Sequence, residues 1–488
     1  MHTADAYDAA VRAGRAFARP RPARVRWRLT LVQVAPERTV FVILSFEGPD
    51  VYSQAGGLGV RVKGLSRTLA QLGYETHLFF IGDPELPSEE TREGGRLHYH
   101  RWCQWLSAFH RGGVYDGEED KLRDWDRSVP SAVIDGIIAP AIESGRSVVV
   151  LAEEWQTAAT INLLSDSLYY RGLRDRVVIL WNANNTFGFQ RINWGALAFA
   201  STITTVSRYM KFRMWEWGQN PIVIPNGVPP STGADADSPA IAALREAASA
   251  DHLCFKIGRF DPDKRWLMAV TAMAYLKQSG SRVRLLIRGG REPHGVQVML
   301  LARSHGLHVA DVKAPDEAAG LARVLRSHPH ADVINVTSYI KDDLLELVYV
   351  ACDAVLANSG REPFGLVGLE VMAAGGLAMV GSTGEDYADP FRNALVLETE
   401  DPVEVVTLLR LLKEKPDLAA SIRKRGLATA RDYSWEKVID QLLLRIDLAA
   451  AQQAVRQEGA DVPPPPAKGT RRKSVTPRKA APSPKSIT

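Results

Sequence analysis

The feature that most constrains this fold is an alternation of short apolar runs with longer helical patterns. The first run, Thr39–Phe46, reads TVFVILSF and is followed by a glycine-rich loop and a helical pattern near Val60–Leu72. Apolar runs of this length are typical of strands buried on both faces, and strands that alternate with helices form parallel sheets. The sequence therefore predicts an α/β fold.

The apolar runs fall into two series, separated by a segment rich in proline and small residues, Pro229–Pro239. The first series continues with Glu75–Ile81, Ser147–Ala152, Val177–Trp181 and Ile222–Ile224. The second series comprises Leu253–Ile257, Val283–Ile287, Asp332–Val336, Ala354–Ala357 and Leu377–Val380. We expect two facing Rossmann-like, doubly wound domains that bind ligands in a cleft at the carboxyl ends of their strands.

The net charge of +4 comes from the two ends of the 488-residue chain. Residues 1–28 hold seven arginines and two aspartates, and residues 456–488 hold eight basic and two acidic residues. The rest of the chain carries 45 basic and 52 acidic residues. The proline-rich tail has few large apolar residues, so we expect it to be disordered. It could touch nucleic acid, anionic lipid or another acidic surface, or only keep the protein soluble.

Cysteine content and hydropathy narrow the class of protein further. Cys103, Cys254 and Cys352 are scattered and odd in number, which disfavours a disulfide framework and indicates a reducing compartment, the cytoplasm. No apolar stretch approaches the roughly 18 residues of a membrane span. His98 and His100 could suggest a metal site with Cys103, but alternation along a strand explains them as well. We expect no metal.

Two glycine-containing loops follow predicted strands where a phosphate could bind. Gly56-Gly57-Leu58-Gly59 precedes a helix, whose start offers N–H groups to an anion; a tight turn would use the same residues. Gly258-Arg259 follows a strand of the second series, with Lys264 in the same loop. These two cations could converge on a diphosphate, or form a surface ion-pair turn with the neighbouring aspartates.

A third loop, after the predicted strand at 354–357, reads SGREPFGLVGLE. Gly365 begins a predicted helix, so its N–H group and those of Leu366 and Val367 would point at an anion. Glu362 precedes a proline and is biased toward extended backbone, and Glu370 lies one turn inside the helix. Two carboxylates beside an anion site make sense if they bind sugar hydroxyls and stabilise positive charge at an anomeric carbon.

The run EPFGLVGLEVMAAG closely resembles the Glu-x7-Glu element of family 4 retaining glycosyltransferases. The resemblance extends to Gly258-Arg259 with Lys264, to Pro225–Val228, to Val206-Ser207 and to Gly56–Leu58. It covers roughly residues 38–445 and implies the GT-B fold. The expected parts are a basic flexible segment at 1–28, an acceptor domain at 29–230, a nucleotide-sugar domain at 231–432, a helix returning to the first domain at 433–455 and the tail at 456–488.

The resemblance also implies roles for the donor-site residues. Arg259 and Lys264 would bind the donor diphosphate and neutralise the leaving nucleotide without a metal or other cofactor, while Glu362 would bind the donor sugar. These three form the expected catalytic set. The remaining donor-binding residues are expected to be Gly56, Gly57, Gly258, Gly365, Leu366, Val367 and the ribose-binding Glu370.

The N-terminal half departs from the family pattern. Gln54 stands where the Lys-x-Gly-Gly-Leu element of starch and glycogen synthases has its lysine. The run at 151–157 replaces their His-x-His-Asp-Trp, and asparagines stand where many members carry a histidine. Glu153, Asn182 and Asn184 are therefore the expected acceptor or sugar ligands.

The resemblance implies a cytoplasmic enzyme that moves a hexose from a nucleoside-diphosphate sugar to a carbohydrate acceptor hydroxyl, with retention of configuration. Its partners would be that donor and a glycan, polysaccharide or small glycoside, with no nucleic acid expected for the body. A disaccharide or glucan synthase of trehalose, sucrose or glycogen type is an alternative. A non-catalytic GT-B protein that binds nucleotide sugar or glycan is another.

Overall fold

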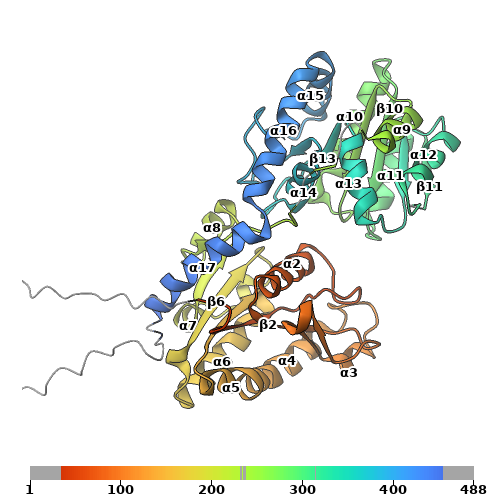
Figure 1. Ribbon diagram of the computed structural model, residues 1–488. Coiled ribbons are helices and arrows are strands. Elements are labelled where there is room, and N and C mark those ends of the chain that lie inside the picture. The colour runs from red at the N-terminus through yellow and green to blue at the C-terminus, as the bar shows by residue number, and fades with distance from the viewer. Residues whose placement is uncertain (1–33, 231–232, 235–237, 314, 454, 456–488) are drawn as a thin grey trace, which may run out of the picture.

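The computed structural model describes residues 34–230, 233–234, 238–313, 315–453 and 455 as two α/β lobes (Figure 1). Each lobe is a twisted sheet covered by helices on both faces, which confirms the predicted fold class. The basic segment 1–28 and the tail 456–488 lie outside the described residues. Within the described part, no helix is both long and apolar enough to cross a membrane.

The sheet of the first lobe has eight strands in the order β3-β4-β2-β1-β5-β6-β7-β8. Their bounds are β1 Thr39–Leu44, β2 Glu75–Ile81, β3 Glu89–Arg92, β4 Leu97–Trp102, β5 Ser147–Glu153, β6 Val177–Ala183, β7 Thr202–Thr205 and β8 Ile222–Val223. Only the short edge pair of β3 and β4 is antiparallel among the described ladders. The main helices are α2 Gly57–Gln71, α4 Glu118–Val133, α5 Ala139–Glu143, α6 Ala158–Tyr170, α7 Trp194–Ala200 and α8 Arg208–Trp215.

The second sheet has seven parallel strands in the order β11-β12-β10-β9-β13-β14-β15. Their bounds are β9 His252–Ile257, β10 Val283–Arg288, β11 Val309–Val312, β12 Val333–Val336, β13 Ala354–Ala357, β14 Ala378–Val380 and β15 Leu395–Val396. The helices are α9 Pro239–Ala248, α10 Trp266–Gln278, α11 His294–Ser304, α12 Ala318–Ser327, α13 Asp342–Ala351, α14 Leu366–Ala374, α15 Pro402–Glu414 and α16 Pro416–Asp432.

Each sheet has one place where the chain reverses its direction of winding. In the first sheet this switch point lies between β1 and β5, and in the second between β9 and β13. Helices leave neighbouring strands toward opposite faces there, so a crevice opens at the carboxyl ends of the two strands. The loops after β1, β5, β9 and β13 are therefore the segments that the fold makes available for ligands.

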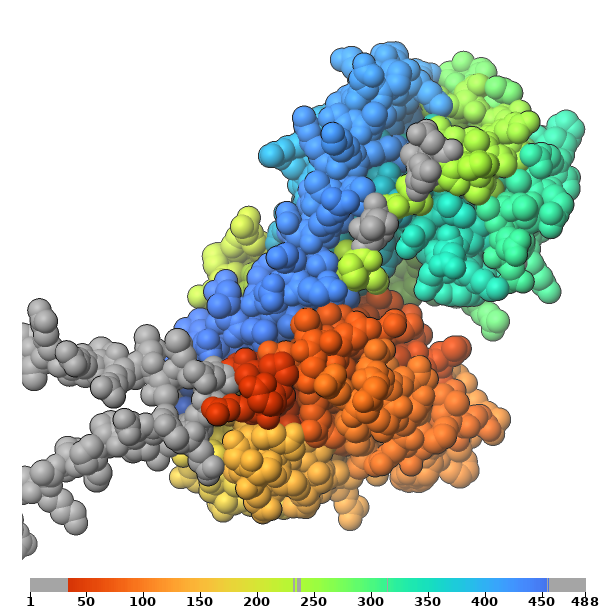
Figure 2. All heavy atoms as spheres, viewed as in Figure 1, coloured from red at the N-terminus to blue at the C-terminus, as the bar shows by residue number. Residues whose placement is uncertain are grey.

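The last helix, α17 (Trp435–Gln452), joins the lobes by packing on the first one after the chain has left the second. It lies against α2 and β6, and the lobes meet at a narrow waist beside it (Figures 1 and 2). Trp435 is buried at this waist, where a Cβ atom on Gly64 or Gly227 would clash with its ring. Glycine at both positions thus lets the crossing helix approach closely.

Candidate active site at the domain junction

The loops after β9 and β13 bring an opposite-charge pair together at the second switch point. Lys264 ends a short 3₁₀ turn, and its ammonium group donates a hydrogen bond to the Glu362 carboxylate. The Gly360 N–H donates to the Asp263 carbonyl at 2.7 Å and fixes one loop against the other. Two residues that lie 98 positions apart in the sequence therefore share one site.

Arg259 is exposed and lies on the same loop as Lys264. Its carbonyl accepts a 2.8 Å hydrogen bond from the Trp266 indole, and the next N–H, that of Phe260, donates to Glu292 at 2.9 Å. These contacts fix the backbone of the loop while the Arg259 guanidinium pairs with no carboxylate among the described residues. The side chain is thus available for an anionic ligand.

A buried lysine on β9 supports the loops that follow β9 and β13. Lys256 lies on β9 and donates to the Asn358 side-chain oxygen at 2.5 Å and to the Leu356 carbonyl at 3.0 Å. Burial lowers the pKa of Lys256, and the charge of Lys264 lowers it further. It holds the start of the Glu362 loop in place. A lysine inside a predicted apolar strand is the sequence signal for this role, although Lys256 was not among the expected site residues.

The start of α14 is open and shaped by glycine. Gly365 has φ +80°, and a Cβ atom there would lie 2.6 Å from the Glu385 side chain, so a side chain would be both strained and obstructed. The Tyr387 hydroxyl donates to the Gly365 carbonyl, and no side chain in the described part of the chain caps the helix. The N–H groups of its first turn, which include those of Leu366 and Val367, have no intrahelical partner and suit an anion.

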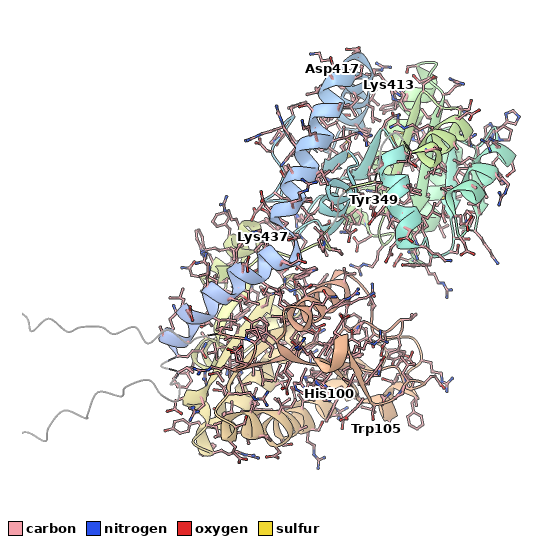
Figure 3. The ribbon with its side chains drawn as sticks, in the orientation of Figure 1. His100, Trp105, Tyr349, Lys413, Asp417 and Lys437 are labelled. Carbon is pink, nitrogen blue, oxygen red and sulfur yellow. The ribbon has the colours of Figure 1, made fainter. Side chains whose placement is uncertain are left out.

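Glu370 lies on the first turns of α14, half-buried against the Tyr349 hydroxyl group. Burial raises the pKa of Glu370 to about 7, and the nearby charge of Asp342 adds to the rise. Figure 3 marks Tyr349 in the second lobe, on α13. A carboxyl group held in this way can exchange hydrogen bonds with hydroxyl groups of a ligand.

Glu385 is a third carboxyl group at the site and was not among the expected site residues. One oxygen accepts the Thr383 N–H at 3.1 Å, and the other is buried with no hydrogen-bond partner in the described residues. Burial raises the pKa of Glu385 to about 8, helped by the neighbouring Glu362. No motif marks this residue; only the fold brings it against Gly365.

In the first domain the Gly56 and Gly59 N–H groups of the glycine loop have an acceptor within the domain. One oxygen of the Glu47 carboxylate accepts three backbone N–H groups, from Ala55 at 3.1 Å, Gly56 at 2.9 Å and Gly59 at 3.0 Å. The other oxygen accepts the Tyr115 hydroxyl at 2.7 Å. The Gly56 N–H expected to face a diphosphate is therefore already bound within the domain.

Gly57, in contrast, faces the second domain. A Cβ atom on Gly57 would lie 3.4 Å from a Leu366 methyl group, so the start of α2 meets the start of α14. The lobes are also joined by hydrogen bonds from the Ser207 hydroxyl to the Pro363 carbonyl and from the Arg208 N–H to Asp386 at 2.7 Å. The Val206-Ser207 motif thus contributes to the junction itself.

The three residues expected to bind an acceptor form one hydrogen-bonded network at the first switch point. Glu153 pairs with the Arg61 guanidinium at 3.0 and 3.1 Å. The Asn182 and Asn184 amides each donate to Glu153 at 2.8 Å. Arg61 also donates to the Asn226 side chain at 2.6 Å, which links the network to the Pro225–Val228 motif.

The histidines of β4 lie elsewhere. His98 and His100 stack on His77 across the sheet, and burial lowers the pKa of His100 to about 3. His100 lies in the first lobe on the side away from the second (Figure 3). Throughout the described ranges, no three His, Cys, Asp or Glu side chains are grouped as a metal ion would need.

Residues 245–428 match the model of the family "Glycosyl transferases group 1". A D-inositol 3-phosphate glycosyltransferase from Actinosynnema mirum is 30% identical over 38% of this chain and 42% of its own length. The enzyme of that name from Segniliparus rotundus is 28% identical over 48% of this chain and 49% of its own length. The matched segments thus span less than half of either relative.

Solved structures match over both lobes at low identity, which bears on the fold alone. The catalytic domain of starch synthase IV from Arabidopsis thaliana, bound to ADP and acarbose, has a TM-score of 0.60 at 18% identity and covers 86% of this chain and 100% of its own. Sucrose-phosphate synthase from Thermosynechococcus elongatus has a TM-score of 0.58 at 17% identity, covering 84% and 100%. The Anabaena protein HepE with UDP-glucose has a TM-score of 0.56 at 14% identity, covering 84% and 100%. The chain therefore has the GT-B fold, and its segment 245–428 is similar to the group 1 glycosyltransferases that the motif resemblance pointed to.

Proposed function

We propose that this chain is a retaining glycosyltransferase that moves a hexose from a nucleoside-diphosphate sugar to an acceptor hydroxyl group. The observation that carries the proposal is that one loop at the second switch point carries Arg259 and Lys264 and meets the loop that leads into the uncapped start of α14. Arg259, Lys264 and the first N–H groups of α14 all favour negative charge, and a diphosphate is the ligand that they suit.

The proposed reaction uses these groups in one step. As the bond between sugar and diphosphate breaks, negative charge develops on the diphosphate and positive charge on the anomeric carbon. Arg259 and Lys264 would stabilise the first charge in place of a metal ion, and Glu362 would bind the donor sugar. The departing phosphate would help to deprotonate the acceptor, which attacks from the same face and so retains the configuration.

The comparisons support a donor of this class. HepE is similar in fold and was solved with UDP-glucose, and the similar starch synthase domain was solved with ADP. The relatives matched by sequence are named for a sugar-transfer reaction onto an inositol phosphate. We propose that Glu370 binds the ribose and that the acceptor binds at the first switch point, beside Glu153.

We also propose that the protein acts in the cytoplasm. Cys103, Cys254 and Cys352 are all buried and unpaired. Free thiols in all three places fit a reducing compartment.

Two measurements test the proposed function before any acceptor is known. Calorimetric titration with UDP, GDP and ADP should give binding of at least one nucleotide, and a screen of nucleotide sugars should give slow hydrolysis with one donor. Binding to none of the three would contradict the donor site. Binding without nucleotide release, across a panel of donors and acceptors, would instead favour a non-catalytic binding protein.

A further inference from the structure

Three buried oxygen atoms at the first switch point have no hydrogen-bond partner among the described residues. They are one carboxyl oxygen of Glu154 and the side-chain oxygens of Gln156 and Asn184. Glu154 and Gln156 are only 3% and 4% exposed. Because almost all buried polar atoms in folded proteins are paired, these three oxygens beyond the neighbouring ends of β5 and β6 are acceptors that a water molecule or a ligand must satisfy.

The orientation of both amides is fixed by carboxylates. The Asn184 nitrogen donates to Glu153 at 2.8 Å, and the Gln156 nitrogen donates to Glu118 at 3.0 Å. Rotating either amide by half a turn would place an oxygen against a carboxylate. The free atoms are therefore oxygens, and they can accept hydrogen bonds from a ligand.

Glu154 is held in a strained conformation that leaves one of its oxygens free. Its backbone has φ 68° and ψ 168°, a region that only glycine adopts readily. Its N–H donates to the Asn182 carbonyl, and its own carbonyl accepts from the Trp181 indole, both at 2.9 Å. One carboxyl oxygen accepts the N–H groups of Asn184 and Asn185, at 2.6 and 3.1 Å. Backbone strain of this kind is typical of functional sites, where it fixes the direction in which a side chain points.

The surroundings of Glu154 are acidic, and the cations in contact with them are neutralised. The Glu153 carboxylate forms an ion pair with Arg61, whose Nε donates to both of its oxygens. Arg191, which lies over the Trp155 ring, forms a two-point ion pair with Glu119 at 2.5 and 2.9 Å. A phosphate group bound here would meet carboxylates rather than free positive charge.

We infer that this strand end binds the hydroxyl groups of a neutral sugar or polyol acceptor that carries no phosphate at this position. The inference rests on the proposed function and names the class of its acceptor. A hydroxyl group both donates and accepts, so it can satisfy the Glu154 carboxyl group whether or not that group is ionised. It can also donate to the free Asn184 and Gln156 oxygens, whereas a phosphate at neutral pH brings mainly acceptors and negative charge.

The test compares matched acceptors with the full-length protein and the nucleotide sugar that the hydrolysis screen identifies. Glucose is paired with glucose 6-phosphate, and myo-inositol with inositol 3-phosphate; neutral disaccharides complete the panel. Acceptor-stimulated nucleotide release should be at least tenfold more efficient, in kcat/KM, with the best neutral compound than with any phosphorylated one. A phosphorylated compound that equals or exceeds the neutral ones would overturn the inference, and so would stimulation by none of the neutral compounds.

Single substitutions test whether the acceptor preference arises at Glu154 and Asn184. Glu154→Gln should raise the acceptor KM about tenfold with a smaller change in kcat, and Asn184→Ala should raise it about threefold. Glu143→Gln, at an exposed position on α5, serves as the matched control and should change neither constant. If Glu154→Gln does not fold, Asn184→Ala and the acceptor panel still decide the question. An unchanged acceptor KM in the folded variants would contradict the proposed binding site.

Nucleotide release without acceptor is measured in the same samples. Its absence, together with a lack of nucleotide binding, would count against the proposed function. Normal release with a preference for a phosphorylated acceptor would count against this inference alone.

Discussion

Both domains place a strand end, a loop and a helix start at the switch point of their sheet. We call these groups of residues the first and the second edge, after their domains, and the two edges differ in charge. In the second domain the start of α14 is uncapped and lies beside Lys264 and the unpaired Arg259. In the first domain Glu47 already binds the N–H groups of Ala55, Gly56 and Gly59 around the start of α2, and Glu153 neutralises Arg61. Lys264 pairs with Glu362 as Arg61 pairs with Glu153, so the second edge differs in its exposed Arg259 and its uncapped helix start, and it suits an anion better than the first.

This difference shows that the fold provides the position of a ligand site, whereas the side chains decide whether an anion can bind there. The switch point supplies a crevice and a helix start in both domains, because the direction of winding reverses in both sheets. Whether that helix start binds a ligand phosphate depends on whether the chain supplies its own carboxylate. Glu47 does so in the first domain, and no described side chain does so for α14.

Removing a cation from the second edge should have the largest effect. Lys264→Ala or Arg259→Ala should lower the rate of donor hydrolysis about 100-fold, near 2.7 kcal/mol, because an electrostatic contact to the leaving diphosphate is lost. Steady-state nucleotide release measures this. Lys424→Ala, at an exposed position of α16, is the control. Full activity in both single variants would remove the two residues from the proposed mechanism.

Removing the carboxylate of the first edge should mainly affect stability. Glu47→Ala leaves three backbone N–H groups and the Tyr115 hydroxyl without their acceptor, and we expect the free energy of unfolding to fall by about 2 kcal/mol. Urea denaturation followed by circular dichroism measures this. Glu47→Gln keeps an oxygen acceptor and should lose less. Equal stability of Glu47→Ala and the wild type would show that the α2 start does not need its carboxylate.

The buried carboxyl group behind α14 should make stability depend on pH. The pKa of Glu385 is raised to about 8 by burial, against 4.5 when exposed, so between these values the folded protein keeps a proton that the unfolded chain has lost. Its contribution to stability is therefore full below pH 4.5 and decreases as the pH rises toward 8. Glu385→Gln cannot ionise and should lose about 1 kcal/mol less than the wild type per pH unit in this window.

Denaturation at pH 5, 6, 7 and 8 measures the difference between the two slopes. Glu414→Gln, at an exposed position near the end of α15, should keep the wild-type slope. Parallel slopes for Glu385→Gln and the wild type would mean that Glu385 is ionised in the folded protein.

The smallest effect is expected for the basic tail. Deleting residues 459–488 should leave transfer activity unchanged within a factor of two, because both edges of the site lie in the two domains. Nucleotide release by the truncated protein measures this directly. A collapse of turnover would show that the tail takes part in the reaction.

Much of the second edge was predictable because its residues form local patterns. The run from Glu362 to Glu370 contains the loop, the helix start and both carboxylates within nine positions, so a local pattern predicts them together. The apolar runs predicted most of the central strands. The short strands β3, β7, β11 and β15 were missed, because a strand of two to four residues is too short to carry a periodic signal. Glu385 was missed because it contacts Gly365 through the fold alone.

The sequence by itself determined the two α/β domains, the family motifs and the residues expected to hold a donor. The alternation of apolar runs with helical patterns and the spacing of glycines are local properties of the sequence. They can be recognised without knowing which residues are in contact. Only the tertiary structure decided which helix start is open. Glu47 binds the N–H of Gly56 because β1 ends beside that loop, and Lys264 meets Glu362 because β9 and β13 are neighbours in the sheet. Hydrogen bonds depend on distances between atoms, and parallel strands set those distances between residues far apart in the chain.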